Sequence, residues 1–335
     1  MGHEALKVNT TGHSNVAVGA DALDANTTGD FNVAIGFDAL GANTTADGNT
    51  ALGYEAMDTN TTGSNNVAVG KGALDGNTTA DNNTGVGYHA LLVNTTGTRN
   101  TAVGALSLDA NTTAVQNTAI GYQALSSNTT GQLNVAVGDE ALFSNTTADN
   151  NTAIGNDALY SNTTGTDNVS VGSQALDANT TGSDNTALGR QALTNNTTAG
   201  NNTGIGNRSL LGTTTGQQNT SIGSDSMFTN STGSTNVAVG FMSLYSNTTA
   251  SNNTAVGMQA LLSNTTGTQN VAVGNNTLDG NTTGDNNTAL GAFALGDQTT
   301  GSNNTAVGRQ ALKFNTTASN NTALGYHALQ VNTTG

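Results

Sequence analysis

Residues Asn9–Ala25 read NTTGHSNVAVGADALDA, and this 17-residue unit decides the fold because it recurs along nearly the whole chain. Nineteen copies follow one another without insertion, and the last is Asn315–Val331, NTTASNNTALGYHALQV. Residues 1–8 form the second half of a further unit and residues 332–335 the start of another, so the units account for all 335 residues. A strict period means that each turn repeats one backbone path, which is typical of a solenoid or roll.

The period also bears on the domain organisation. A chain of this length would ordinarily suggest two globular domains, but the uninterrupted repeat predicts a single repeat domain over residues 1–335 with no linker. The terminal units look like all the others, whereas solenoids usually end in atypical capping units. This favours a segment of a longer protein.

Within the unit, Asn15-Val-Ala-Val-Gly19 alternates small and β-branched residues with a period of two, which predicts a short strand. The following xxALxx segment is the expected second strand, and NTTGxx is the expected return loop. Two short strands and two turns in each unit predict an all-β parallel β-roll, or β-solenoid, of about 20 turns. Successive turns of such a roll stack about 4.8 Å apart.

Three columns of the repeat never change: the Asn that precedes the strand (Asn15, Asn32, Asn49), the Gly that ends it (Gly19, Gly36) and the Thr that closes NTT (Thr11, Thr28, Thr45). Identical side-chain amides one turn apart can hydrogen-bond along the roll, and they can also satisfy buried backbone groups at the bend. We therefore expect the Asn column to form a structural ladder. The Gly column is expected at the point where the chain must turn.

The apolar content of each unit is small. One column, which includes Val18 and Ile35, always holds Val, Ile or Leu, and a second, which includes Leu23 and Leu40, holds Leu with two Met exceptions. We assign both columns to the core.

The residue that follows the invariant Asn is always Val, as at Val16, or Thr, as at Thr50. It should point to the same side of the strand as the Val18 column, because strand side chains alternate between faces. A partly apolar stripe on so thin a roll predicts that several chains associate side by side. Whenever Ala follows NTT, as at Ala46, this residue is Thr and never Val, which we interpret as packing between loop and strand.

Composition excludes several classes of function. The chain has 22 acidic and 7 basic residues and a net charge of −15, which argues against nucleic acid or an anionic membrane as a partner. There is no Cys, and no apolar stretch resembles a signal peptide or a membrane span. The four His are scattered, and neither a Ser-His-Asp pattern, a metal-ligand spacing nor a phosphate loop is present. We therefore expect no enzyme activity, cofactor or metal.

All thirteen aromatic residues occupy variable positions of the unit, and Tyr54, Tyr88 and Tyr122 share the position just after the invariant Gly. Two interpretations are open for these tyrosines. They contact a surface glycan by stacking on sugar rings, or they pack in a groove between chains.

The strings SNVAVG and NNTALG, each followed by xxAL, resemble the NSVAIG-type repeats of YadA-like trimeric autotransporter adhesin heads, and Asn117–Gly131, NTAIGYQALSSNTTG, resembles the shafts of phage tail fibres. The resemblance covers the whole chain, although the 17-residue period is longer than that familiar in the adhesin heads. It implies a left-handed β-roll, a bundle of three identical chains and an extracellular or virion location. It also implies attachment to a cell-surface glycan or protein receptor.

These observations predict a structural fibre segment of a surface adhesin or phage tail fibre, a stiff rod for attachment or receptor display. A Thr-rich ice-binding β-solenoid is the alternative. It is disfavoured because the two Thr of NTT are adjacent and point to opposite faces. A polysaccharide-cleaving enzyme would need facing carboxylates, and Asp139 and Glu140, the only adjacent acidic pair, point apart.

Overall fold

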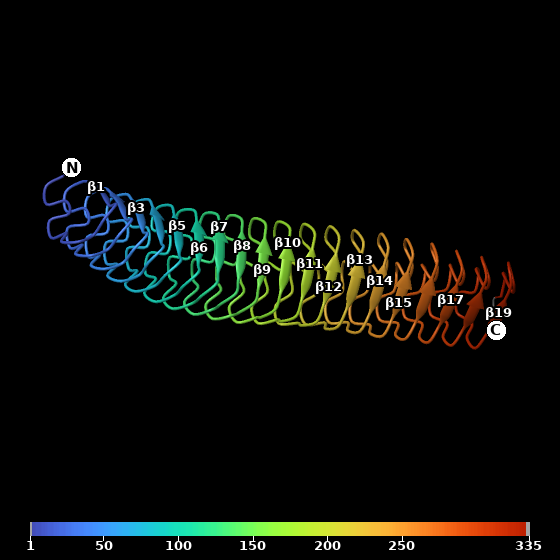
Figure 1. The fold of residues 1–335 in the computed structure, drawn as a ribbon. Coiled ribbons are helices and arrows are strands. Elements are labelled where there is room, and N and C mark those ends of the chain that lie inside the picture. The colour runs from blue at the N-terminus through green and yellow to red at the C-terminus, as the bar shows by residue number, and fades with distance from the viewer. Residues whose placement is uncertain (1, 333–335) are drawn as a thin grey trace. The chain divides into compact units, whose positions relative to one another are not determined.

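The computed structural model describes residues 2–332, which form an all-β parallel solenoid with a 17-residue repeat and no helix. The chain divides into two compact units, residues 1–167 and 168–335. In each unit the strands lie side by side, one from each turn (Figure 1). Across the described residues, about 18 turns separate the first of the nineteen strands from the last, compared with the 20 turns expected.

Every strand is three residues long. The first unit contains β1 (Val16–Val18), β2 (Val33–Ile35), β3 (Thr50–Leu52), β4 (Val67–Val69), β5 (Thr84–Val86), β6 (Thr101–Val103), β7 (Thr118–Ile120), β8 (Val135–Val137) and β9 (Thr152–Ile154). The second unit contains β10 (Val169–Val171), β11 (Thr186–Leu188), β12 (Thr203–Ile205), β13 (Thr220–Ile222), β14 (Val237–Val239), β15 (Thr254–Val256), β16 (Val271–Val273), β17 (Thr288–Leu290), β18 (Thr305–Val307) and β19 (Thr322–Leu324). Strands of successive turns pair in parallel at an offset of one repeat, as in Ala34 with Ala51 and Ala238 with Ala255.

The invariant Gly ends each strand for two physical reasons. Gly36 has a φ of 146°, a conformation that side chains with a β-carbon rarely adopt. A β-carbon at Gly36 would also lie only 2.1 Å from the carbonyl oxygen of Gly53 in the next turn. The same conflict recurs at Gly19, where the nearest atom is the carbonyl oxygen of Gly36. This column therefore cannot vary.

The prediction of a second strand over xxALxx is wrong. In the second turn this segment is a series of turns, and Asp38 and Leu40 have left-handed φ values of 56° and 53°. Adjacent side chains on a strand point to opposite faces, yet Ala39 and Leu40 are both fully buried. The left-handed residues rotate the chain so that both side chains enter the interior, which a regular strand could not do.

The interior of each turn is formed by the middle strand residue and the Ala-Leu pair. Ala34, Ala39 and Leu40 have no exposed surface. A β-carbon at Gly85, in the middle of β5, would lie 3.3 Å from Cγ of Leu74, which places the middle strand column against the Leu column. Leu23 and Leu40 thus lie in the core, as we expected from the sequence.

The assignment of Val18 and Ile35 to the core is corrected by the structure. Val18 is 46% exposed and Ile35 is 37% exposed. A three-residue strand turns one residue inward and two outward. The inward residue is the central Ala, so the flanking residues face away from the interior.

Two parallel columns of buried Asn side chains connect the turns. In the column that opens NTT, the amide Nδ2 of Asn43 donates to Oδ1 of Asn26 at 2.9 Å. In the column that precedes the strand, the backbone N–H of Asn49 donates to Oδ1 of Asn32 at 2.9 Å. The side-chain amide of Asn49 donates instead to the carbonyl of Gly63. The amide-to-amide ladder that we expected at Asn15, Asn32 and Asn49 is therefore formed mainly by the NTT column.

The NTT ladder is interrupted where Thr213 and Gln298 replace Asn. Thr213 has no amide to donate, and Oδ1 of the preceding residue in the column, Asn196, is buried without a hydrogen-bond partner. Likewise Oδ1 of Asn281, one turn before Gln298, is buried without a partner. A buried acceptor that has lost its donor is costly, because its hydration is not replaced.

Thr213→Asn should therefore stabilise the second unit. The new amide restores the donor to Asn196 and is expected to add about 1 kcal/mol to the free energy of unfolding. Thermal unfolding followed by circular dichroism should show a Tm increase of about 2–4 °C. As the matched control, Asn128→Thr in the intact ladder should lower Tm. An unchanged or lower Tm for Thr213→Asn would show that the missing hydrogen bond to Asn196 does not reduce the stability of the fold.

Candidate functional site

The outward side chains of the strands form the most regular exposed surface of each unit. We call the first and third residues of β1–β9, and likewise those of β10–β19, the strand face of each unit. The first residue is always Val or Thr and the third is always Val, Ile or Leu, so no position of the strand face carries a charge. Large apolar side chains are exposed there, including Leu52 at 45% and Leu188 at 46%.

From the sequence we assigned the third strand residues, such as Val18 and Ile35, to the core, although they belong to this exposed face. The variation within the column could have indicated its exposure. A densely packed interior position tolerates little change in shape, and the buried Leu column accepts only two Met exceptions. The third strand residue instead alternates among Val, Ile and Leu.

Twelve of the first strand residues are Thr. None of these twelve hydroxyls has a hydrogen-bond partner among the described residues. By contrast the first Thr of NTT uses its hydroxyl within the chain, as Thr27 Oγ1 donates to the carbonyl of Thr44 at 3.0 Å. The strand-face hydroxyls therefore remain available to water or to another molecule.

The tyrosines that were candidates for glycan contact are exposed, but two of them have occupied ring faces. Tyr54 is stacked on Phe37 of the previous turn, with ring centroids 5.4 Å apart. Lys71 of the next turn lies over the Tyr54 ring at 5.4 Å. Because these neighbours come from opposite sides, a sugar could stack on Tyr54 only after one of them moved.

Tyr88 stacks on the ring of His89 at 3.8 Å. Tyr122 is 49% exposed and has no ring partner among the described residues. Of the three tyrosines, Tyr122 thus offers the most accessible ring face.

Carboxylates gather along one side of the first unit. A β-carbon at Gly41 would lie 2.2 Å from Oδ1 of Asp38 and 3.0 Å from Oδ1 of Asp58, so both carboxylates reach the same point. Burial raises the pKa of Asp58 from 3.8 to about 6, and the neighbouring carboxylates of Asp38 and Asp75 contribute to the increase. Burial also raises the pKa of Asp38 and of Asp75.

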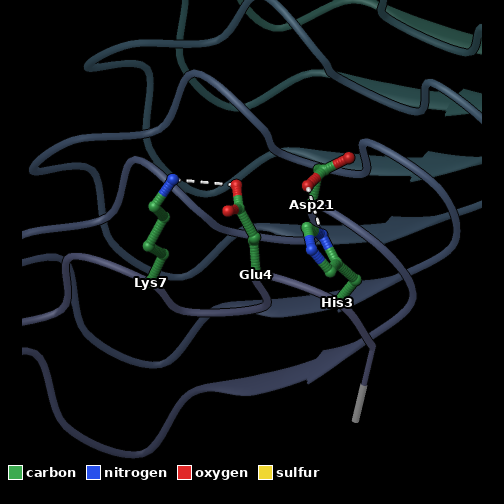
Figure 2. Close-up of polar contacts among 4 residues, drawn as sticks. All are labelled: His3, Glu4, Lys7 and Asp21. Atoms are coloured by element: carbon green, nitrogen blue, oxygen red, sulfur yellow. Dashed lines mark hydrogen bonds and ion pairs between the residues drawn. The ribbon is translucent and has the colours of Figure 1, made fainter.

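One group of potential metal ligands occurs among the described residues: His3, Glu4 and Asp21, whose ligand atoms lie within 4.8 Å of one another. Figure 2 shows that Lys7 reaches Glu4, with Nζ 2.8 Å from Oε2, while His3 lies beside Asp21 at 3.9 Å. The ammonium group of Lys7 already neutralises one carboxylate, and the His3 side chain is 79% exposed. We assign no metal to this cluster.

The second unit contains a polar cluster that the sequence did not indicate. Arg208 forms an ion pair with Asp225 in the next turn at 2.8 Å, and Asp225 is only 5% exposed. In the interior nearby, Ser209 donates to Ser221 with an Oγ–Oγ distance of 2.7 Å. These hydroxyls are fully buried and bonded to each other, which suits them to packing rather than to reaction with a substrate.

Comparison with protein-family models and with curated protein sequences finds no match. Residues 2–332 contain no long apolar helix of the kind that crosses a membrane.

Asp58→Asn should stabilise the first unit at neutral pH. The folded-state pKa is raised, so the stability gained from protonation is fully present below pH 3.8 and is lost as the pH rises through about 6. Asn mimics the protonated carboxyl, and at pH 7 we expect a Tm increase of about 1–3 °C after allowance for solvent screening. At pH 3.5 the two proteins should unfold at the same temperature.

Thermal melts at the two pH values test this expectation. The exposed Asp139 provides the control, because Asp139→Asn removes the same charge outside this cluster. A gain that is equal at both pH values would contradict the electrostatic explanation.

Proposed function

We propose that this chain is a structural segment of a surface fibre, either an adhesin or a phage tail fibre, in which identical chains pack together through their strand faces. The observation that supports this proposal is the uncharged, partly apolar strand face, which recurs in every turn. Its exposed Val, Ile and Leu side chains would be removed from water by a second copy. The resemblance to trimeric adhesin repeats makes three the expected number of chains.

The charge distribution agrees with this assembly. With a net charge of −15, two copies repel each other at most orientations. The strand face brings no carboxylate of either copy into the contact, whereas the turns after each strand carry residues such as Asp38, Glu55 and Asp58. Association through the strand face therefore keeps the charged side chains in solvent.

In this function the repeat supplies reach and stiffness, and the variable exposed positions contact a receptor. A glycan or protein on a cell surface is the expected partner, and the cell exterior or the virion is the expected location. Tyr122 is the strongest candidate for a sugar contact because its ring is exposed and unstacked. No catalytic step is assigned to the chain.

The assembly can be tested with two outward valines of the first unit. Val69→Asp and Val103→Asp, made together, put carboxylates on the strand face without entering the interior. We expect sedimentation to show the native chain as an oligomer, mainly trimeric, and the double variant as a folded single chain, because a buried unpaired carboxylate disfavours the contact.

Thr62→Asp and Thr96→Asp form the matched control, because these exposed residues belong to the same two turns but lie in the NTT loop. This control should remain oligomeric. A native chain that sediments as a monomer at all concentrations would refute the proposed assembly.

Ice binding is the second candidate function. The adjacent Thr of NTT argued against it, but one feature of the strand face favours it. The strand face presents Thr and an aliphatic residue two positions apart, as at Thr118 and Ile120, in a regular parallel array. We nevertheless expect no thermal hysteresis from the assembled protein, because assembly covers this face. Nanolitre osmometry measures the effect directly. Hysteresis from a stable monomer would favour ice binding over the fibre.

A further inference from the structure

We propose that the order of Val and Thr along the strand face sets the axial register in which identical chains pack. This inference rests on the proposed function, since it concerns the same face and takes a second copy of the chain as its partner. It adds a specificity determinant to that contact. The determinant is the first residue of each strand, which we call the register column.

The register column is not random. From β2 to β19 it follows the order Val-Thr-Val-Thr-Thr-Thr three times, a superperiod of six turns or 102 residues. The first period begins at Val33, the second at Val135 and the third at Val237. The third strand residue, which shares the same face, shows no such division because it is always aliphatic.

A repeat protein needs such a determinant because its turns are otherwise equivalent. Two copies that slide by one turn again place strand against strand and aliphatic residue against aliphatic residue. Only the turns lost at the ends oppose this slip. The register column makes these otherwise equivalent registers differ in free energy. A polar residue in the core of a coiled coil fixes the register of its helices in the same way.

The hydroxyl provides the discrimination. Val and Thr have nearly the same shape, so steric fit alone cannot distinguish them. Two facing Thr hydroxyls can donate and accept a hydrogen bond between chains, and two facing Val side chains exclude water. A Thr that faces Val is buried without a partner, which is unfavourable. The strand-face Thr hydroxyls have no hydrogen-bond partner among residues 2–332, so no bond within the described part of the chain offsets this penalty.

The sequence order makes most slips costly. A slip of one or of three turns places Val opposite Thr in four of every six turns, and a slip of two turns does so in two of six. Within β2–β19, full matching returns only after six turns, when six turns of overlap have been lost at each end. The aligned register is therefore the one that satisfies every hydroxyl.

A variant with a permuted register column tests the order of Val and Thr without changing the number of turns that two chains can share. In this variant Thr replaces Val16, Val33, Val67, Val135, Val169, Val237 and Val271, and Val replaces Thr101, Thr186, Thr220, Thr288 and Thr305. In the turns of all five Thr that change, Gly follows the loop triplet (NTT, or its variants TTT and QTT). No strand with Ala at that position therefore receives a Val, a combination that the native chain never shows. The variant keeps the full length and nearly the same composition but opposes the native pattern in twelve turns.

Native chains and permuted chains are unfolded together, refolded and counted by native mass spectrometry. Native chains mixed with ¹⁵N-labelled native chains give the statistical control. We expect mixed assemblies of native with permuted chains to be about tenfold or more below that control, because each mismatch leaves a hydroxyl unpaired. Statistical mixing of native with permuted chains would overturn the proposal. A native chain that is monomeric would instead refute the proposed function itself.

Disulfide mapping provides a second test that does not depend on folding of the permuted variant. The chain has no Cys, so Val69→Cys and Ile120→Cys, three turns apart on the strand face, can be placed in separate native-pattern chains. Three turns span about 14 Å, which exceeds the reach of a disulfide. We expect each variant to crosslink to itself and not to the other. Equal yields of mixed and self crosslinks would overturn the proposal.

Discussion

The structure depends on the requirement that each turn hydrogen-bond to a copy of itself. The amide of Asn43 donates to Asn26 in the previous turn, and the backbone of Asn49 donates to Asn32 in the same way. In the column that opens NTT, the side chain must offer both the donor that the preceding turn needs and the acceptor that the following turn needs. Asn does both, and Thr213 shows the consequence of replacing it, an unpaired acceptor on Asn196. The repeat itself therefore constrains both Asn columns, because each residue is bonded to its equivalents in the neighbouring turns.

The same requirement explains why most of the variation lies on the outside of the solenoid. Gly36 cannot change because the backbone of the next turn occupies the space of its β-carbon. Most aromatic and charged side chains occupy outward positions, where Phe37 and Tyr54, for example, stack on each other and stay partly exposed. The strand face is intermediate. It varies among Val, Thr, Ile and Leu but never admits a charge, as the proposed contact between copies requires.

Those parts of the fold that follow from the period could be predicted from the sequence. The parallel stacking, the buried Leu23 and Leu40 and the structural use of the Asn column need only the spacing of 17 residues. The path of the chain between strands could not be predicted. Leu40 adopts a left-handed conformation that a bulky residue ordinarily avoids. No propensity indicates it, because it is imposed by the burial of two adjacent side chains.

The misplacement of Val18 has a different cause. Aliphatic residues at a period of two indicate one apolar face of a strand, but they do not say whether that face meets the interior of its own chain or another chain. In a roll this thin the interior accommodates Ala34 and Leu40, which leaves no room for Ile35. The apolar content of the sequence thus exceeds what a single chain can bury. The excess apolar side chains lie in columns along the strands, and these columns are the surface that the proposed packing of identical chains would cover.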